Sequence, residues 1–223
     1  RDDALRLLAG DLAPGCVGVD KLWPSHFAIR LMELQSDVRL AVGSKPVDEA
    51  RMLKDEEELA RLRAASRAND QAVAAVARSL ALGDSELSVG RRFADEGVRL
   101  GAQGVSFTPL VCFGANCAEP HHSSDGTRLN RGDAVILDLG LDVDHAMSDM
   151  TRTVFFGTPT DEQRRVYELV RRANAAAKAA VKPGVPLKDI DRAARAVIED
   201  AGYGPAFLHR TGHGVGLAVH EPP

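Results

Sequence analysis

Two aspartates, Asp138 and Asp149, occupy positions in or near expected strands that suggest more than an ordinary exposed surface charge. Asp138 interrupts the apolar run Val135-Ile136-Leu137-Asp138-Leu139, in which an unpaired charge is costly to bury. Asp149 follows eleven residues later, near the start of the next expected strand. Neighbouring strands joined by a short turn can bring the two carboxylates together, where each raises the pKa of the other unless cations lie between them. The pair therefore favours a metal site, the alternative being that each acid pairs with an arginine such as Arg152.

Three of the seven histidines lie in one short glycine-rich segment near the end of the chain. They are His209, His213 and His220, with glycines at 212, 214 and 216 between them. Glycine allows a tight turn and a close approach of backbone, so His213 can project into a crowded site. A single histidine in a strand is usually an ordinary packed or surface residue, but three around a glycine turn favour a site. Imidazole and carboxylate ligands together suit Mn, Co, Zn or Fe.

Another pair of histidines, His121 and His122, ends the loop sequence Asn116-Cys-Ala-Glu-Pro-His-His. A loop histidine held over a metal site can donate a hydrogen bond to a substrate carbonyl or take up a proton. The alternative is that both side chains are simply exposed on a surface loop.

Apolar periodicity and capping residues predict the elements that position these side chains. Residues 1–50 alternate between helix and strand and end in a linker near residues 43–50, whereas later helices accompany antiparallel strands, which predicts an α+β domain. Helices are expected at 1–12, 25–34 (capped by Ser25), 55–82, 86–100 (opened by Ser85), from Thr160 to about 181, and 187–201. Strands are expected at 17–19, 37–42, 105–113, 134–141 and 148–157, with a strand, a glycine turn and a strand over 206–221.

The composition fits an ordinary globular protein and excludes some classes of function. The 223 residues are 44% hydrophobic and 27% charged, enough for one sizeable core. The net charge of -4 and the pI near 6.0 give no electrostatic footprint for nucleic acid or an anionic membrane. No apolar run approaches the roughly 18 residues of a membrane span. Cys16, Cys112 and Cys117 form no CxxC pair and predict reduced thiols in a cytoplasmic protein.

Four motifs follow one another in an order that resembles a known enzyme family. They are the histidine pair at 121–122, Ile136-Leu-Asp-Leu-Gly140, Ser148-Asp-Met-Thr-Arg-Thr153 and the segment from His209 to Pro223. This order, and the intervals of 17 residues from His121 to Asp138 and 7 from His213 to His220, resemble the metal-dependent Xaa-Pro peptidases (prolidase and aminopeptidase P) of the pita-bread, or creatinase/aminopeptidase, fold.

The resemblance covers nearly the whole chain and implies two domains. Residues 1–50 resemble the C-terminal half of a creatinase-like N-terminal domain with its linker. Residues 51–223 resemble the pita-bread metallopeptidase domain, incomplete at its C-terminus. The family supplies two further glutamate ligands downstream, and Glu221 is not a ligand in the family pattern. The expectation is therefore a fragment cut at both ends, which alone binds metal weakly and is inactive.

The resemblance also implies a role for each motif residue. Asp138 would chelate one metal ion, Asp149 would bridge two, and His213 would bind the second. His121 and His220 would be catalytic, stabilising the tetrahedral intermediate or moving protons, and His209 would bind substrate near the proline pocket. Thr151 and Arg152 would lie next to Asp149 and help to orient its carboxylate.

The implied activity is hydrolysis of the Xaa-Pro bond, in dipeptides or at peptide N-termini, by a metal-bridged hydroxide. Two divalent metal ions are expected, with Mn preferred over Co, Zn or Fe. The partners implied are a small peptide substrate and a second copy of the chain in a homodimer, with no nucleic acid and no membrane. The dipeptidase branch is slightly favoured.

Two other functions stay open at this point. A metal-free creatinase-like C–N hydrolase would keep the histidines without needing the set Asp138, Asp149 and His213, so the intact set counts against it. A non-catalytic pita-bread module that binds a protein or RNA partner would be expected to lose ligands, and the acidic balance counts against RNA.

Overall fold

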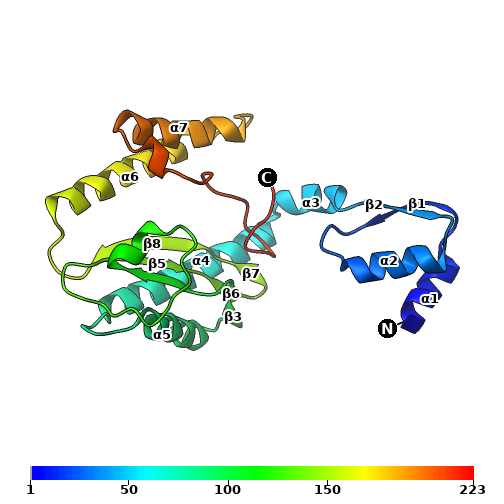
Figure 1. Ribbon diagram of the computed structural model, residues 1–223, viewed down its shortest axis with the longest axis horizontal. Helices are drawn as coiled ribbons and strands as arrows, with labels where there is room; N and C mark the ends of the chain where they lie inside the picture. The colour runs from blue at the N-terminus through cyan, green and yellow to red at the C-terminus, as the bar shows by residue number, and fades with distance from the viewer. Residues whose placement is uncertain (1) are drawn as a thin grey trace. The chain divides into compact units, whose positions relative to one another are not determined.

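A computed structural model describes residues 2–223, and the chain divides into two compact units, Arg1–Leu53 and Lys54–Pro223 (Figure 1). In the first unit, β1 (Gly15–Val19) and β2 (Val38–Val42) pair in parallel, in register from Gly15 opposite Val38 to Val19 opposite Val42. The connection between them is α2 (Ser25–Leu34), and α1 (Asp2–Asp11) precedes β1. Helix and strand therefore alternate as predicted.

Two details of this unit differ from the prediction. The stretch expected as a linker near residues 43–50 is mostly helical, because α3 (Lys45–Met52) occupies it, and the division between the two units falls after Leu53. Pro46 lies in the first turn of α3, where its missing N–H costs nothing, and Arg51 lies in the last turn, where a cation suits the helix dipole. The expected cap of α2 is wrong: Ser25 is its first helical residue, Pro24 occupies the cap position, and no side chain caps this end.

The second unit begins with two helices whose starts are fixed by their own sequence. The first is α4 (Glu56–Arg78), which Asp55 opens with a full capping box. The second is α5 (Glu86–Arg99), where Ser85 and Ser88 form the same reciprocal arrangement. Both helices pack against the sheets described next (Figure 1).

Two three-stranded antiparallel sheets follow, with strand orders β4-β5-β8 and β3-β6-β7. Their members are β3 (Gly104–Val105), β4 (Leu110–Phe113), β5 (Ala134–Leu139), β6 (Leu141–Val143), β7 (Ala146–Met147) and β8 (Met150–Phe155). The strand predicted over 105–113 is thus two strands in different sheets, and the one predicted over 134–141 changes sheets at Gly140. A Cβ on Gly140 would lie 2.2 Å from the carbonyl oxygen of Ser148, so only glycine fits this junction.

The main core lies between these sheets and the helices α4 and α5. Along β5 the side chains of Val135, Leu137 and Leu139 are fully buried in it. Successive side chains of a strand point to opposite faces. Asp138 therefore points to the face of the sheet turned away from this core.

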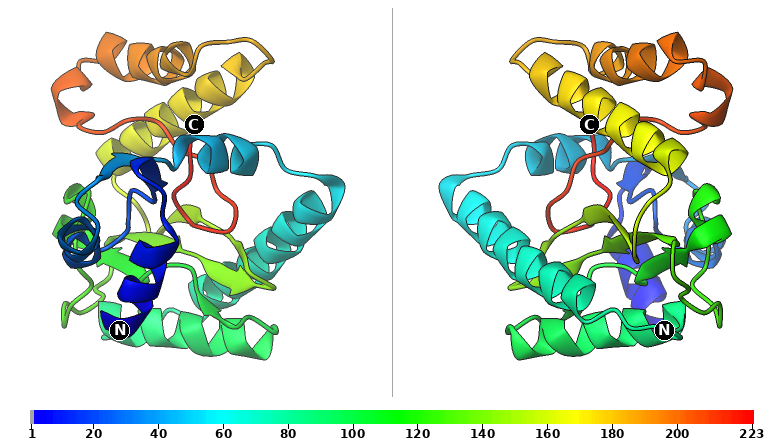
Figure 2. Two further views of the ribbon diagram at one scale, coloured as in Figure 1. Left: turned by 90° about the vertical axis from the view of Figure 1, so that its right-hand side faces the viewer. Right: turned by 90° about the vertical axis from the view of Figure 1, so that its left-hand side faces the viewer.

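A second, smaller core joins α6 (Asp161–Ala180) to α7 (Leu187–Asp200), which lie side by side in both views of Figure 2. It is formed by Leu169, Ala173, Ala177, Ala194 and Ile198. Thr160 caps α6 as predicted, in a capping box with Gln163.

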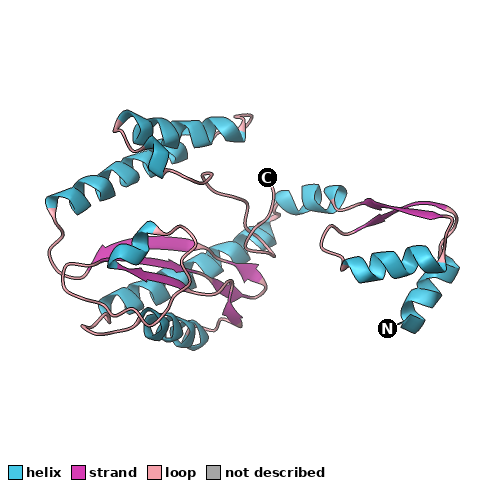
Figure 3. Cartoon of the chain, in the orientation of Figure 1, coloured by secondary structure: helices cyan, strands magenta, loops and turns pink. Residues whose placement is uncertain are grey.

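The strand–turn–strand predicted over 206–221 is wrong. After the short 3-10 helix η2 (Gly204–Ala206) the chain runs as loop (Figure 3), closed by one antiparallel bridge between Gly214 and Glu221. Closely spaced glycines disfavour regular strand, which is the physical reason for the difference. No helix within residues 2–223 is long and apolar enough to cross a bilayer.

Candidate metal centre

Asp138 lies on the central strand β5, directly opposite Thr151 of β8. The Thr151 hydroxyl donates a hydrogen bond to Asp138 Oδ1 over 2.6 Å. Thr151 therefore supports Asp138, where the sequence had suggested Asp149. This hydrogen bond fixes the rotamer of a half-buried carboxylate and leaves Oδ2 for another partner.

Arg152 does not neutralise the predicted acids. It pairs in register with Leu137, on the core side of the sheet, and so lies on the opposite face from Asp138. Its guanidinium reaches Asp70 of α4 over 3.4 Å and donates to the carbonyl of Thr151. Both suggestions made for Arg152, as an ion-pair partner of these acids and as a support for Asp149, are wrong because the strand turns its side chain away.

Asp149 lies between β7 and β8, and its side chain is 27% exposed. His213 Nε2 lies 3.3 Å from Asp149 Oδ2, and His213 Nδ1 lies 2.9 Å from the carbonyl oxygen of Gly214. A carbonyl only accepts, so Nδ1 carries the proton. In the neutral ring Nε2 then carries the lone pair and points at the carboxylate. This is the tautomer that metal-binding histidines adopt, held by a hydrogen bond from the other nitrogen.

The charges around Asp149 reveal a crowded anionic site. Burial raises the pKa of Asp149, and the nearby Asp138 carboxylate raises it further, against the opposite influence of His213 and His220. The His213 and His220 rings are in contact, with their centroids 4.2 Å apart and their planes tilted by 41°. Four of the six predicted site residues are therefore brought together: Asp138, Asp149, His213 and His220.

The loop that carries His213 and His220 is held against the strands and the start of α4. The amide of Met147 donates to the carbonyl oxygen of Gly216 over 2.9 Å. Lys54 Nζ lies 3.0 Å from the almost fully buried carboxylate of Glu221. A Cβ on Gly214 would lie 2.4 Å from the carbonyl oxygen of Pro222, so glycine is required for the close approach that the sequence suggested.

His209 is held by a different part of the unit. Its carbonyl oxygen accepts from Arg195 of α7, and its ring packs edge-on against Phe207, centroid to centroid 5.6 Å. Asp191, also on α7, accepts from the amide and hydroxyl of Thr211. Hydrogen bonds from Arg195 and Thr211 lower the pKa of Asp191 to about 2. The predicted substrate-binding residue thus lies beside an aromatic ring on the α7 side.

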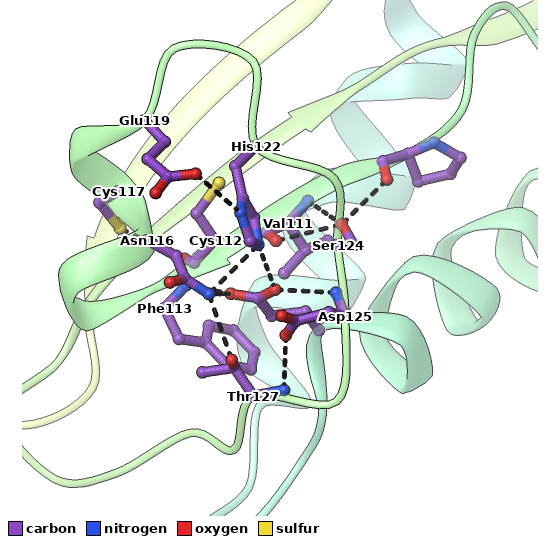
Figure 4. A network of polar contacts seen from close by, with 12 residues as sticks. Val111, Cys112, Phe113, Asn116, Cys117, Glu119, His122, Ser124, Asp125 and Thr127 are labelled. Carbon is purple, nitrogen blue, oxygen red and sulfur yellow. Dashed lines mark hydrogen bonds and ion pairs between the residues drawn. The ribbon is translucent and has the colours of Figure 1, made fainter.

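His121 is exposed on the loop between β4 and β5, while the adjacent His122 is largely buried. The His122 ring lies 2.7 Å from a carboxylate oxygen of Glu86, and this hydrogen bond raises the pKa of His122 (Figure 4). Glu86, His122 and Asp125 have possible ligand atoms within 4.8 Å of one another. Glu86 carries no local signal in the sequence, because a glutamate just after a serine cap is ordinary at a helix start.

Cys117 is a structural residue. Its thiol donates weakly to the carbonyl oxygens of Cys112 and Ala134, and burial raises its pKa. Burial likewise raises the pKa of Cys112, to about 12. All three cysteines are free, and these two are poor nucleophiles because the thiolate is disfavoured.

Comparison with known proteins agrees with this arrangement of possible metal ligands. The model of metallopeptidase family M24 matches residues 60–223. An uncharacterized peptidase of Staphylococcus haemolyticus is 40% identical over 175 residues, 78% of this chain and 50% of that protein. The prolidase from Pyrococcus furiosus superposes with a TM-score of 0.93 at 31% identity, covering 100% of this chain and 65% of that chain. The prolidase from Thermococcus sibiricus gives 0.95 at 32% identity, covering 100% and 61%.

The chain spans about half the length of the curated relative and less than two thirds of either prolidase structure. Over that span, the superpositions confirm the predicted α+β pita-bread fold. The family model covers well over half of the chain, including every predicted metal ligand. The chain belongs to metallopeptidase family M24.

Proposed function

We propose that the protein containing this chain hydrolyses the Xaa-Pro bond of dipeptides, with two divalent metal ions held in part by Asp138, Asp149 and His213. The observation that supports the proposal most directly is the orientation of the His213 ring. Its Nδ1 proton is committed to a backbone carbonyl and its Nε2 is aimed at Asp149. Membership of a metallopeptidase family and superposition on two prolidases support the same conclusion.

The donors fit a metal site by their chemistry as well as by their positions. Two carboxylates whose mutual repulsion contributes to the raised pKa of Asp149 gain from a cation placed beside them. Oxygen donors with one imidazole suit Mn, Co, Zn and Fe, and Mn is our first choice. When bound, two such ions polarise a peptide carbonyl and lower the pKa of a water held beside it.

The surrounding histidines supply the remaining roles in this proposal. His220, whose ring contacts that of His213, is assigned the role of donating a hydrogen bond to the carbonyl oxygen of the scissile bond. His121, on its exposed loop, is assigned a similar catalytic role. His209, beside the ring of Phe207, is assigned to the pocket that accepts proline, where an aromatic face suits an apolar ring. A homodimer and a cytoplasmic location remain predictions.

The test uses the complete gene product, with metal analysis and Gly-Pro and Ala-Pro hydrolysis measured on the same preparation. We expect about two Mn, Co or Zn ions per chain, as in dinuclear hydrolases, and activity that Asp149→Ala abolishes. Asp95→Ala, which removes an exposed carboxylate on α5, is the matched control and retains both metal and activity. Cleavage of Gly-Pro but not of longer peptides with proline second identifies a dipeptidase.

A metal-free protein that stays inert toward both peptides after reconstitution contradicts the proposal. Hydrolysis of a non-peptide C–N bond without metal would then point to a creatinase-like enzyme. No hydrolysis at all would favour a binding module.

A further inference from the structure

β4 is an edge strand of its sheet, yet side chains occupy its outer edge. The outward amide of Val111 donates to Ser124 Oγ over 2.7 Å, and that of Phe113 donates to Glu86 Oε1 over 2.8 Å. The Ser124 hydroxyl also faces the carbonyl oxygens of Pro109 and Val111, each 3.1 Å away. Ser124 and Glu86 together replace a neighbouring strand.

The Glu86 carboxylate is fully buried and makes four hydrogen bonds, two to each oxygen. An ionised carboxylate offers about four lone-pair sites, and here each has a donor. The donors are Phe113 N at 2.8 Å, Asn116 Nδ2 at 2.9 Å, His122 Nε2 at 2.7 Å and Asp125 N at 3.0 Å. Figure 4 shows these groups converging from the end of β4 and from the loop that follows it. With its acceptor sites filled, Glu86 organises the loop and has no site left for a metal ion.

This network determines where the loop runs. It ties His122 and Asp125 to the first turn of α5, while Ser124 ties the same segment to Val111. Val111 is next to Leu110, which lies opposite Asp138 in the register of the sheet. The loop therefore turns back along the outer edge of β4, toward Leu110. This residue lies opposite the predicted metal ligand Asp138 on β5.

We propose that Glu86 and His122 are positioning residues that hold the neighbouring His121 for catalysis. This inference rests on the proposed function, in which His121 contacts the substrate. An exposed histidine on an unanchored loop would spend much of its time away from a productive geometry, and a misplacement of about 1 Å can cost a hundredfold in rate. The buried hydrogen bond between His122 and Glu86 supplies the anchor one residue away.

The test compares His122→Leu with His122→Gln in the complete gene product. Leucine removes the donor to Glu86, whereas the glutamine amide keeps a donor within reach of it. We expect kcat for Gly-Pro to fall roughly 10–100-fold in His122→Leu, the usual range for residues that orient a ligand or catalytic group. His122→Gln is expected to retain most of the activity, and both variants to retain the wild-type metal content. Ser124→Ala removes the second anchor and is expected to lower kcat in the same way.

Coupling to His121 separates positioning from general damage. In a His121→Ala background, His122→Leu is expected to change kcat by less than about twofold, because residues that act through one another are not additive. An independent loss of the full factor in that background overturns the proposal, as does wild-type kcat in His122→Leu. Loss of one metal ion per chain in His122→Leu also overturns it, in favour of a metal site at Glu86, His122 and Asp125.

Hydrogen exchange gives a result that does not depend on activity. The amides of Phe113 and Asp125 donate to Glu86 and are expected to exchange faster in His122→Leu than in His122→Gln. If the wild-type protein hydrolyses no peptide, the proposed function fails. In that case, equal exchange rates in the two variants show that the hydrogen bond between His122 and Glu86 does not hold the loop either. Faster exchange in His122→Leu shows that it does hold the loop.

Discussion

Asp191 offers the sharpest test of how residues 209–220, the histidine segment, are held in place. Its carboxylate accepts from Arg195 Nε over 3.0 Å and from the amide and hydroxyl of Thr211 over 2.9 Å and 3.0 Å. These bonds join α7 to the start of the loop that carries His213. We expect Asp191→Asn to lower the free energy of unfolding at pH 7, because an amide replaces a charged acceptor that faces a guanidinium.

The magnitude follows from the pKa of Asp191, which falls from 3.8 to about 2 on folding. At 1.36 kcal/mol per pH unit the change corresponds to roughly 2 kcal/mol. The side chain is 25% exposed, so solvent screening reduces the expected effect to about 1–2 kcal/mol. Because the folded pKa is lower than the unfolded one, this stabilisation is present above about pH 4 and is lost as the pH falls toward about 2.

Urea unfolding of both proteins at pH 7, 4, 3 and 2 measures the difference directly. The gap between wild type and Asp191→Asn should be largest at pH 7 and shrink between pH 4 and 2. Asp200→Asn, an exposed position on the same helix, should change the free energy of unfolding by less than about 0.5 kcal/mol at every pH. The reasoning is refuted by a gap that stays constant down to pH 2, or by no gap at pH 7.

Two further predictions concern residues that stabilise the elements around the site without belonging to it. Lys54→Met removes the ammonium 3.0 Å from the buried Glu221 carboxylate and should lower the free energy of unfolding by about 3 kcal/mol in urea; a loss under about 1 kcal/mol would show that the pair adds little. Gly140→Ala places a Cβ 2.2 Å from the carbonyl oxygen of Ser148 and should cost about 1–3 kcal/mol. Gly104→Ala, whose Cβ meets nothing within 4 Å, should change stability by less than about 0.5 kcal/mol, and equal effects in the two would contradict the steric argument.

Local sequence signals predicted what local physics controls. The alternation around Asp138 fixed its strand and its face, because the buried neighbours at 137 and 139 force the residue between them outward. Ser85 and Thr160 marked helix starts because the two side chains of a capping box lie within four residues of each other. Glycine spacing predicted the turn at His213, but the strands predicted on either side of it are absent from the described residues 206–221.

Long-range pairing was beyond the sequence. The four partners of Glu86 lie 27 to 39 residues further along the chain, so no local pattern relates them. Which of the adjacent residues His121 and His122 turns inward depends on that same carboxylate. The direction of Arg152 depends on the register of β8 against β5, and one residue of slip would have aimed it at the other face.

The two separate cores of the second unit have a thermodynamic consequence. Among the described residues, the core around β5 and the core between α6 and α7 have no member in common. The histidine segment connects them: Asp191 holds it on the α7 side at Thr211, and Met147 holds it on the sheet side at Gly216. Proteins open locally in contiguous cooperative units, and we expect each core to be the centre of one, so heating the ligand-free protein should give two overlapping calorimetric transitions for this unit. Any ligand that ties Asp149 to the histidine segment is lost when either block melts, and so draws the two transitions into one.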